Sequence, residues 1–560
     1  MSRWGARHWR LLESLAFLGL SLIWLLPWAF SGRLYLGDDL QFHLNRLQGL
    51  THYIATTGRW WAVPPVTTGA FSEWGYPINL FYPAVTLLPA AWLHLVVNGV
   101  TAYYLFLGLV TDLTLELTAW VGRRLLDSRL AGAVLAVIYG FAQYRLLDFF
   151  VRGALAEGLV LAVLPLVIYG AYCLIAGDDR QWFWLAIGMA LVALTHVLSV
   201  VLCSLAILGM LGLWGLRRDR LKARLGHLVL AGGATVLLAA TFLVPLAEQL
   251  YRSPSLGVMR YQLAQSALQP GQFLRDTLQN RVTSDHVGLG LSLLLASLVA
   301  VLAWRRLRSI DRYFLILGWV NVWLATRWFP WRLLQGPLGM LQFPWRCLTL
   351  ATFFIALAGA QGMVQLGRPS RLREQLGLLV GVTVIVVSLS LTANQRLYRQ
   401  VATGPKIVTA TTYHAATQQA VDQDADYLPA AATPTMAAIR TKSVAVMNTQ
   451  PNGQRPSGLH VVSRRVQPLG VSYRIRSRTA RIVRLPVIYF YDDRVWVNGR
   501  PQDFWLDATR VIAVQLRRGI NRVTYRYHPT VSQRVSGWVS LVVWLGGLGL
   551  VIRWRRRPER

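Results

Sequence analysis

The sequence has little charge and almost no cysteine. Only 15% of the 560 residues are Asp, Glu, Lys or Arg, whereas a soluble domain carries roughly 25%. The cysteines, Cys173, Cys203 and Cys347, lie within apolar segments, a placement that indicates neither a disulfide framework nor a thiolate metal site. Several apolar runs approach the roughly 17–25 residues that cross a bilayer. We therefore predict an integral membrane protein with many spans.

Motifs of several enzyme classes are also missing. The chain has no Walker-type glycine loop, no His-Glu-x-x-His and no Gly-x-Ser-x-Gly, which argues against ATP bound to this chain, a zinc protease or a serine hydrolase. The net charge of +32 would suggest nucleic acid in a soluble protein. Here Lys and Arg fall largely between apolar runs, a pattern typical of topology signals and lipid headgroup contacts. We predict membrane lipids as partners and no nucleic acid.

The basic clusters predict the topology. They lie at 3–10, 123–129, 217–224, 305–312, 368–373 and 553–560. The positive-inside rule places all of them in the cytoplasm, which requires about twelve spans, at 11–30, 101–121, 130–146, 158–176, 182–194, 197–216, 226–246, 287–304, 312–327, 344–366, 375–392 and 536–553. Both termini are then cytoplasmic, in a multi-pass protein of the cytoplasmic membrane. The first span is interpreted as retained, because its apolar run is too long for a signal peptide and lacks a small-residue cleavage site.

We predict a mainly α integral membrane fold with one β-rich outer domain. A membrane domain spans 1–392 and includes a first outer loop at 31–100, in which 84–97 is interpreted as an interfacial or re-entrant helix. An extracytoplasmic β-sandwich-like domain spans 393–534, because alternating stretches end in turn signals such as Asn498-Gly499. Residues 535–560 form the last span and a basic tail.

The first outer loop carries the strongest candidate for catalysis. In a helix starting at Asp39, the side chains of Asp39 and His43 share one face, with Arg46 one turn further. A carboxylate beside an imidazole suits a general base, or half of a weak site for a divalent cation such as Mg or Mn. The alternative is that Asp39 only caps an interfacial helix. No other cofactor is predicted.

Aromatic residues follow in the same loop. Tyr76 and Tyr82 lie in Gly75-Tyr-Pro and Phe81-Tyr-Pro. Anchoring at the level of the lipid headgroups accounts for them, and a platform on which a sugar stacks is the alternative.

Further candidates lie at the outer ends of predicted spans. Arg152 and Glu157 are five residues apart, too far for an ideal helical pair, which favours contact with a ligand. His196 lies at an outer turn, where a packing role competes with ligand binding. Arg346, in Gln-Phe-Pro-Trp-Arg, could hold a phosphate through its planar guanidinium group. The alternative is that its side chain only extends to the membrane–water interface.

With these residues in view, the chain resembles the YfhO-like bacterial membrane proteins, and more closely the "6-pyruvoyl-tetrahydropterin synthase-related" membrane group. Both resemble the GT-C class of lipid-linked-sugar glycosyltransferases. The matching motifs are Asp39-x-x-x-His43-x-x-Arg46, Gly75-Tyr-Pro with Phe81-Tyr-Pro, Arg152-Gly-Ala-Leu-Ala-Glu157, Leu194-Thr-His196, Gln342-Phe-Pro-Trp-Arg346 and Tyr427-Leu-Pro429. The resemblance implies that Asp39 is the base that activates an acceptor hydroxyl, with Asp38 as the alternative, and that Arg152 and Arg346 hold a polyprenyl phosphate.

The resulting hypothesis is an inverting membrane glycosyltransferase. It would move a sugar from a polyprenyl-phosphate donor to an envelope glycan or lipid on the outer face, and its basic outer domain could dock an anionic acceptor such as a teichoic acid. A transporter or flippase of a lipid-linked or polymeric substrate is the first alternative. That function needs charged or broken helices at mid-membrane depth. The second is a non-catalytic factor in envelope assembly.

Overall fold

The computed structural model describes residues 3–212, 220–252, 261–419, 426–429, 432, 436–446 and 458–555. Parts of two predicted basic clusters, 217–219 and 556–560, lie outside these residues. The chain forms two compact units. Unit 1 comprises Met1–Leu40, Val100–Val236 and Arg260–Ala410, and unit 2 comprises Gln41–Gly99, Leu237–Met259 and Thr411–Arg560.

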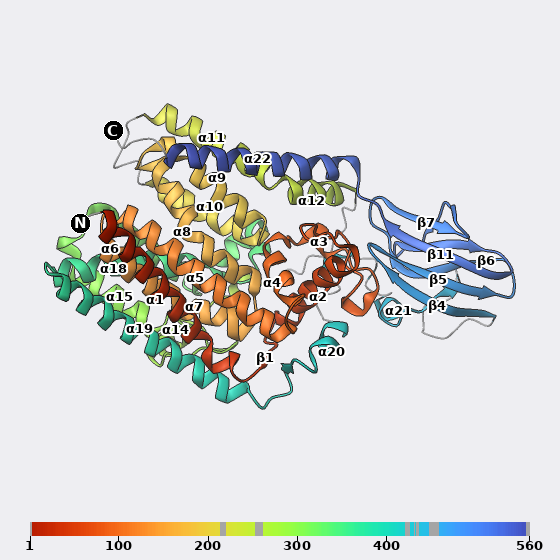
Figure 1. The fold of residues 1–560 in the computed structure, drawn as a ribbon, viewed down its shortest axis with the longest axis horizontal. Coiled ribbons are helices and arrows are strands. Elements are labelled where there is room, and N and C mark those ends of the chain that lie inside the picture. The colour runs from red at the N-terminus through yellow and green to blue at the C-terminus, as the bar shows by residue number, and fades with distance from the viewer. Residues whose placement is uncertain are drawn as a thin grey trace. The chain divides into compact units, whose positions relative to one another are not determined.

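Unit 1 is a bundle of apolar helices (Figure 1). Its helices are α1 (Arg3–Ala29), α5 (Gly99–Leu125), α6 (Arg129–Gly140), α7 (Gln143–Leu146), η3 (Leu147–Arg152), α8 (Leu155–Ile175), α9 (Phe183–Ala193), α10 (Val197–Met210), α11 (Leu221–Leu238), α13 (Leu263–Ser266), α14 (Pro270–Leu278), α15 (Leu291–Leu302), α16 (Ser309–Ala325), α17 (Gln335–Leu338), α18 (Leu348–Gly367) and α19 (Leu372–Val401). The C-terminal ends of α1 and α19 are followed by two short antiparallel strands, β1 (Arg33–Tyr35) and β2 (Ile407–Thr409).

Each predicted span overlaps a helix, and the predicted spans 130–146 and 226–246 are each divided between two helices. Fewer helices are long enough to cross a membrane than the dozen predicted. Within the described residues, seven are long and apolar enough by length and composition. They are Arg10–Ala29, Gly99–Leu125, Arg129–Arg152, Leu155–Ile175, Leu221–Leu238, Pro344–Gly367 and Leu372–Val401. Others are short: α10 has 14 residues and α15 has 12. At 1.5 Å per residue such helices reach only about 20 Å.

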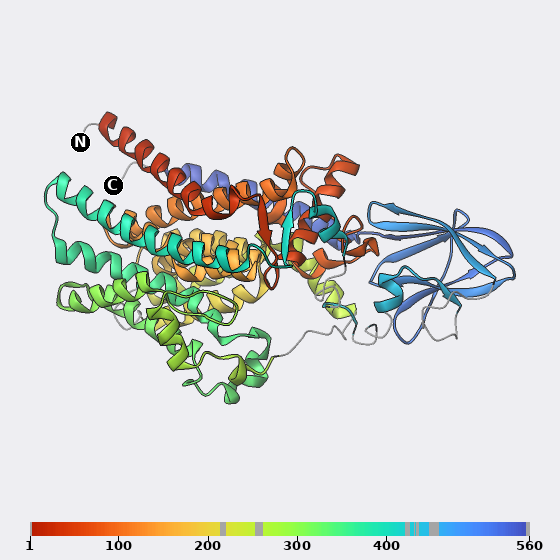
Figure 2. The ribbon, with the colours of Figure 1, turned by 90° about the horizontal axis from the view of Figure 1, so that it is seen from below.

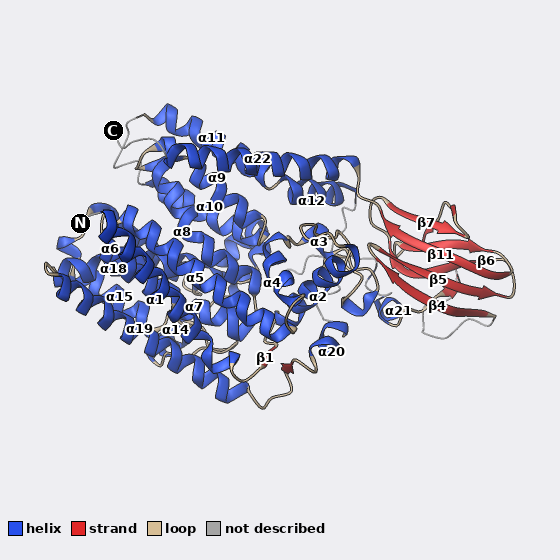
Figure 3. Cartoon of the chain, in the orientation of Figure 1, coloured by secondary structure: helices blue, strands red, loops and turns tan. Residues whose placement is uncertain are grey.

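Unit 2 combines short helices with two antiparallel sheets, which Figure 3 shows in red. The helices are α2 (Leu40–Thr57), α3 (Ile78–Phe81), α4 (Leu88–His94), α12 (Ala240–Arg252), α20 (Tyr413–Gln418), α21 (Met436–Arg440) and α22 (Val531–Arg555). The strands are β3 (Ala445–Val446), β4 (Leu459–Gln467), β5 (Gly470–Ser477), β6 (Arg481–Ile488), β7 (Asp493–Val497), β8 (Arg500–Pro501), β9 (Trp505–Leu506), β10 (Val511–Leu516) and β11 (Gly519–Tyr527).

The β-rich region is confirmed where the alternating pattern predicted it. One sheet has the order β3-β6-β10-β9 and the other β4-β5-β11-β7-β8, and residues of both sheets share one apolar core. The hairpin β7–β8 turns at Asn498 and Gly499, whose φ angles are 53° and 82°. These positive angles at both positions are those of a type I′ turn, which explains why Asn-Gly identifies it.

Residues 41–99 of the predicted first loop pack with the β-rich region and belong to the same unit. A second core joins aromatic residues of the loop, including Phe71, Trp74 and Tyr76, to Phe490 and Tyr527. Tyr76 is fully buried, and its hydroxyl donates to the carbonyl of Asp426 at 2.7 Å. No face of its ring is therefore exposed for a sugar. Each of the two compact units is built from several separate stretches of chain.

Candidate active site

A group of charged side chains lies buried at the adjoining ends of two candidate spans. Arg152 is 5% exposed, and its Nη1 lies 2.7 Å from Asp148 Oδ1 and 2.9 Å from Glu157 Oε2. Tyr144 donates its hydroxyl to Glu157 Oε1 at 2.6 Å. Arg346 Nε lies 3.3 Å from Glu157 Oε2. Two arginines and two carboxylates thus neutralise one another in a region that excludes water.

The backbone around Gly153 explains why Arg152 and Glu157 meet. The π-helical segment η3 ends at Arg152, Gly153 is left-handed with φ 66°, and α8 starts at Leu155. The chain therefore reverses between the two charges. The argument that a spacing of five residues keeps them apart is wrong, because it assumed one continuous helix.

Asp38 and Asp39 are attached to this cluster through the backbone. Their amide N–H groups both donate to the carbonyl of Arg152, at 2.9 and 2.7 Å. Asp39 Oδ2 lies 3.8 Å from Arg152 Nη2, and the side chain of Asp39 is 35% exposed. Asp39 is thus an accessible carboxylate at the edge of the buried cluster, a position from which a base could meet an incoming hydroxyl group.

The second carboxylate has a different environment. Ser284 Oγ donates to Asp38 Oδ1 at 3.2 Å. Burial, and then the charge of Asp39, raise the pKa of Asp38 above its usual value, while Arg152, Ser284 and Lys406 oppose the shift. A carboxylate with a raised pKa is a stronger base once it is deprotonated. Both acids are therefore placed to act as a base.

Two residues that sequence reasoning left out complete the cluster. Asp148 is fully buried and pairs with Arg152 four residues later, a helical spacing that could have identified it. The ring of Trp345 lies 4.5 Å from Arg152 Cζ. Trp345 precedes Arg346, and its aromatic face gives a buried cation an additional favourable contact.

His196, His43 and Arg46 are buried and hydrogen-bonded. His196 is buried at the start of α10, with Nδ1 2.8 Å from Ser199 Oγ. In unit 2, Arg46 Nη1 lies 3.3 Å from His43 Nδ1, and its Nη2 donates to the carbonyls of Tyr82 and Pro83.

The surroundings of Arg46 are aromatic. The ring of Tyr82 lies 4.2 Å from Arg46 Cζ, and burial lowers the pKa of Arg46 to about 10.

A divalent-cation site at Asp39 and His43 was predicted from the sequence. The described residues contain no group of three or more His, Cys, Asp and Glu side chains that could hold a metal ion. Asp39 belongs to unit 1 and His43 to unit 2.

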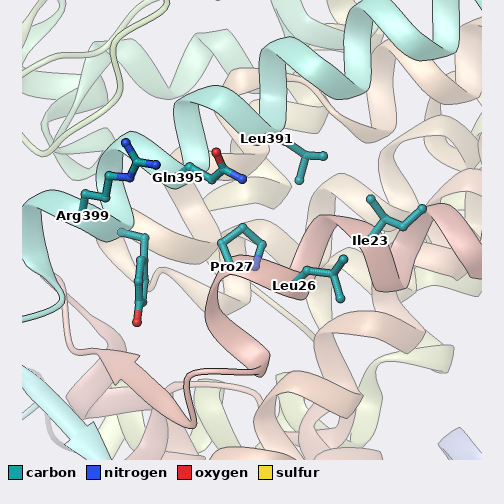
Figure 4. A pocket seen from close by; sticks show the side chains of 7 residues that line it. Ile23, Leu26, Pro27, Leu391, Gln395 and Arg399 are labelled. Atoms are coloured by element: carbon teal, nitrogen blue, oxygen red, sulfur yellow. The ribbon is translucent and has the colours of Figure 1, made fainter.

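An apolar groove with a polar end lies on the same unit as Asp39. It is bounded by α1 and α19, which run side by side (Figure 2). Its volume is about 400 Å³, and its lining residues are Ile23, Leu26, Pro27, Leu391, Gln395, Tyr398 and Arg399. Figure 4 shows Arg399 and Gln395 together at one end, with Ile23 and Leu391 towards the other. Trp28 Nε1 donates to Asn394 Oδ1 at 2.6 Å and holds the two helices together.

The apolar helices and the polar cluster between their ends define an integral membrane protein. The model of the family "6-pyruvoyl-tetrahydropterin synthase related domain; membrane protein" matches residues 80–396. This is more than half of the chain, and the chain therefore belongs to that family. The matched segment contains Arg152, Glu157 and Arg346 and begins after Asp39. No curated protein matches the chain.

Two solved structures are similar to the chain. The arabinofuranosyltransferase AftD from Mycobacteria aligns with a TM-score of 0.44 and 15% identity, over 70% of this chain and 27% of that one. The chain thus spans about a quarter of AftD. ArnT from Cupriavidus metallidurans, in a structure bound to undecaprenyl phosphate, aligns with a TM-score of 0.42 and 14% identity, over 80% of this chain and 84% of that one.

The turn before Asp38 gives a first testable prediction. Gly37 has φ 56°, and a Cβ there would collide with the carbonyl oxygen of Val151. We expect Gly37→Ala to displace Asp38 and Asp39 from the Arg152 carbonyl and to lower the activity of this site about 100-fold, since a displacement of about 1 Å has such effects. Gly32→Ala is the matched control, because its φ is also positive and no atom lies within 4 Å of the added Cβ. Equal activity of both variants would contradict the prediction.

Proposed function

We propose that this protein is a membrane glycosyltransferase that moves a sugar from a polyprenyl-phosphate donor to an acceptor of the cell envelope. The observation that carries the proposal is the position of Asp39, an accessible carboxylate fixed by its backbone to the edge of a buried arginine–carboxylate cluster. The motif resemblance described above implies the same chemistry. The reaction would take place on the outer face of the cytoplasmic membrane, with both termini in the cytoplasm.

The chemistry requires one base and one group that receives an anion. Asp39 accepts the proton of an acceptor hydroxyl as the oxygen attacks the anomeric carbon, and the bond from that carbon to the phosphate oxygen breaks. The phosphate leaves with the bonding electrons, so that a single displacement inverts the anomeric configuration. A phosphate is already a good leaving group, and electrostatic stabilisation of its charge is sufficient.

Arg152 and Arg346 are the proposed phosphate ligands, and both are already paired. Each contacts Glu157 at 2.9 and 3.3 Å, respectively. An incoming phosphate would therefore have to share these arginines with Glu157 and Asp148. The paired carboxylates keep the two guanidinium groups oriented before the donor arrives, which lowers the cost of ordering them on binding.

The groove between α1 and α19 fits the lipid part of such a donor. Ile23, Leu26 and Leu391 offer apolar contact to an isoprenoid chain, and Arg399 places a positive charge at the polar end of the groove, separate from the proposed phosphate ligands Arg152 and Arg346. We expect undecaprenyl phosphate to remain bound to the purified wild-type protein in native mass spectrometry, and to be lost from Arg399→Glu and from Leu26→Trp, which reverses the charge and fills the groove.

The control for this experiment is Leu105→Trp, an exposed position on α5 that does not line the groove. Retention of undecaprenyl phosphate by both groove variants would exclude the groove as its site. Retention of phosphatidylglycerol in place of undecaprenyl phosphate would show a site for bilayer lipids and would also contradict the prediction.

The transport alternative requires charges along a path through the membrane. In the described part of the chain, Asp148, Arg152 and Glu157 gather at the adjoining ends of two spans. This cluster at one end supports a transferase at the membrane surface. Asp112, near the middle of the candidate span Gly99–Leu125, is a charge that a transport path would use, so the proposal rests on the position of Asp39.

The test of the proposed function is a comparison of envelope glycans in a deletion strain and its complemented derivative. We expect one defined sugar to disappear on deletion and to return with the wild-type gene. Loss of the sugar together with accumulation of its lipid-linked precursor on the cytoplasmic side would instead support transport, because a transferase that lacks its acceptor step leaves the precursor on the outer side.

A further inference from the structure

The five-stranded sheet of unit 2 has one face covered by arginines. Along β5, β7 and β11 the residues alternate between buried and exposed. Six exposed positions of this sheet hold arginines, Arg465, Arg474, Arg476, Arg494, Arg522 and Arg526. The other exposed positions hold His460, Val462, Ser463, Arg500, Pro501 and Ile520. No Asp or Glu occupies an outward position on these strands, because Asp493, their single acidic residue, is buried. The face is therefore strongly positive.

The register places some of these arginines directly opposite one another. Arg522 on β11 pairs with Arg474 on β5, and Arg526 pairs with Arg494 on β7. Like charges in directly opposed positions destabilise a sheet, because the side chains lie only about 5 Å apart at their Cβ atoms. Two such pairs on one face lower the stability of the sheet, so stability does not account for their presence.

The charges on this face are largely uncompensated. Among the described residues, Arg494 has an ion pair, with Asp492 at 3.5 Å. Arg474, Arg476, Arg522 and Arg526 contact no described carboxylate. Strands lie about 4.8 Å apart and alternate residues about 7 Å apart along a strand. The arginines therefore form a grid at strand and residue spacings, in which Ser472, Thr524 and Trp496 occupy the positions between them.

A grid of this kind suits a polymer with repeated anionic groups. A single small anion would contact one or two arginines and leave the repulsion of the others in place. A chain of phosphates or carboxylates would neutralise several at once and release their counterions, which makes multivalent binding strong and dependent on salt.

We propose that the exposed face of the β4-β5-β11-β7-β8 sheet binds a linear polyanion with phosphate or carboxylate repeats. Within the proposed function this polymer is the acceptor or its growing product, and only that assignment rests on the transferase activity. The binding itself requires neither Asp39 nor the sugar donor.

The test uses the full-length protein in neutral nanodiscs, with inorganic polyphosphate and polyglutamate as probes. Dextran serves as the neutral polymer. We expect wild type to bind at least one of the polyanions but not dextran, with an affinity that falls steeply as salt rises. Arg474→Gln with Arg522→Gln should weaken binding at least tenfold and reduce the slope of log K against log salt by about 2, one for each lost cation.

The matched control removes the same charge from another place. Arg517 and Arg518 are exposed at the turn between β10 and β11, and Arg517→Gln with Arg518→Gln should leave binding within about twofold of wild type. The melting temperature provides a second readout. If the Arg474–Arg522 pair is maintained for a ligand, its removal weakens binding while the melting temperature at low salt stays constant or rises, because repulsion is relieved.

Several outcomes would overturn the proposal. They are the absence of polyanion binding by wild type, an equal loss of binding in the control pair, and preferential binding to phosphatidylglycerol vesicles, which would identify a membrane-facing surface. The proposed function fails independently: polyanion binding with unchanged glycans in the deletion strain would retain this surface and reject the transferase.

Discussion

Asp39→Asn is expected to reduce sugar transfer by at least about 100-fold, because removal of a general base has effects of roughly 10²–10⁴. Asparagine preserves the size of the side chain, and the backbone N–H of residue 39 can still donate to the Arg152 carbonyl. The fold should therefore persist. The measurement is the amount of the affected sugar in envelope glycans of a deletion strain that expresses each variant, with membrane levels determined by immunoblot.

The control for this variant is Asp127→Asn. The Asp127 side chain is 85% exposed and pairs with Arg308, so its loss should leave transfer within about twofold of wild type. Full complementation by well-expressed Asp39→Asn would show that Asp39 is not the base. A scaffold or transport role would then explain the chain better.

The pH dependence of transfer distinguishes Asp38 from Asp39. A base acts in its deprotonated form, so activity falls as pH drops through its pKa. Ser284 lowers the pKa of Asp38 through a hydrogen bond, and Ser284→Ala should therefore raise that pKa. If Asp38 is the base, the acidic limb of the rate profile moves to higher pH in Ser284→Ala. If the acidic limb of the rate profile stays at the same pH in Ser284→Ala, Asp39 is the base.

Arg152→Gln is expected to cause the largest loss of stability. The change leaves Asp148 and Glu157, whose side chains are 0% and 1% exposed, without the cation that joins them. Breaking one partner of a buried ion pair costs about 3–5 kcal/mol of unfolding free energy. The measurement is the thermal unfolding of the purified protein in detergent, supported by its level in membranes.

A second substitution should restore part of this loss. In Arg152→Gln with Asp148→Asn, one fewer uncompensated carboxylate remains, so the double variant should unfold at a higher temperature than Arg152→Gln alone. If Arg152→Gln unfolds like wild type, water or another cation solvates the carboxylates, and the cluster contributes little to stability.

Local patterns predicted the elements of this fold well. Apolar length identified the helices, since a residue in a bilayer must be apolar wherever it faces lipid. Alternation followed by Asn498-Gly499 identified a hairpin, because that dipeptide adopts the positive φ angles that the turn requires. The number of spans was not predicted as well. Helices such as α10 and α15 are apolar along their whole length but short.

The candidate site was predicted in part. Asp39, Arg152, Glu157 and Arg346 were singled out as charges at the ends of spans, and the structure brings all four together in unit 1. Arg46, from its helical spacing, and Tyr76, from an aromatic motif, were also candidates, but they lie in unit 2, bonded to backbone carbonyls. Spacing along the chain could not distinguish a side chain of the cluster from one that only donates a hydrogen bond to a buried backbone carbonyl, because the same types of polar residue do both.

Composition and periodicity alone determined that this is a membrane protein with many apolar helices and a β-rich region near its C-terminus, because both properties follow from local contact with lipid or water. The tertiary structure decided which charges meet. The left-handed turn at Gly153 brings Glu157 to Arg152, and the register of β5 and β11 sets Arg474 opposite Arg522. Both contacts depend on where the backbone reverses or pairs, and no pattern of residue types within one segment specifies that position.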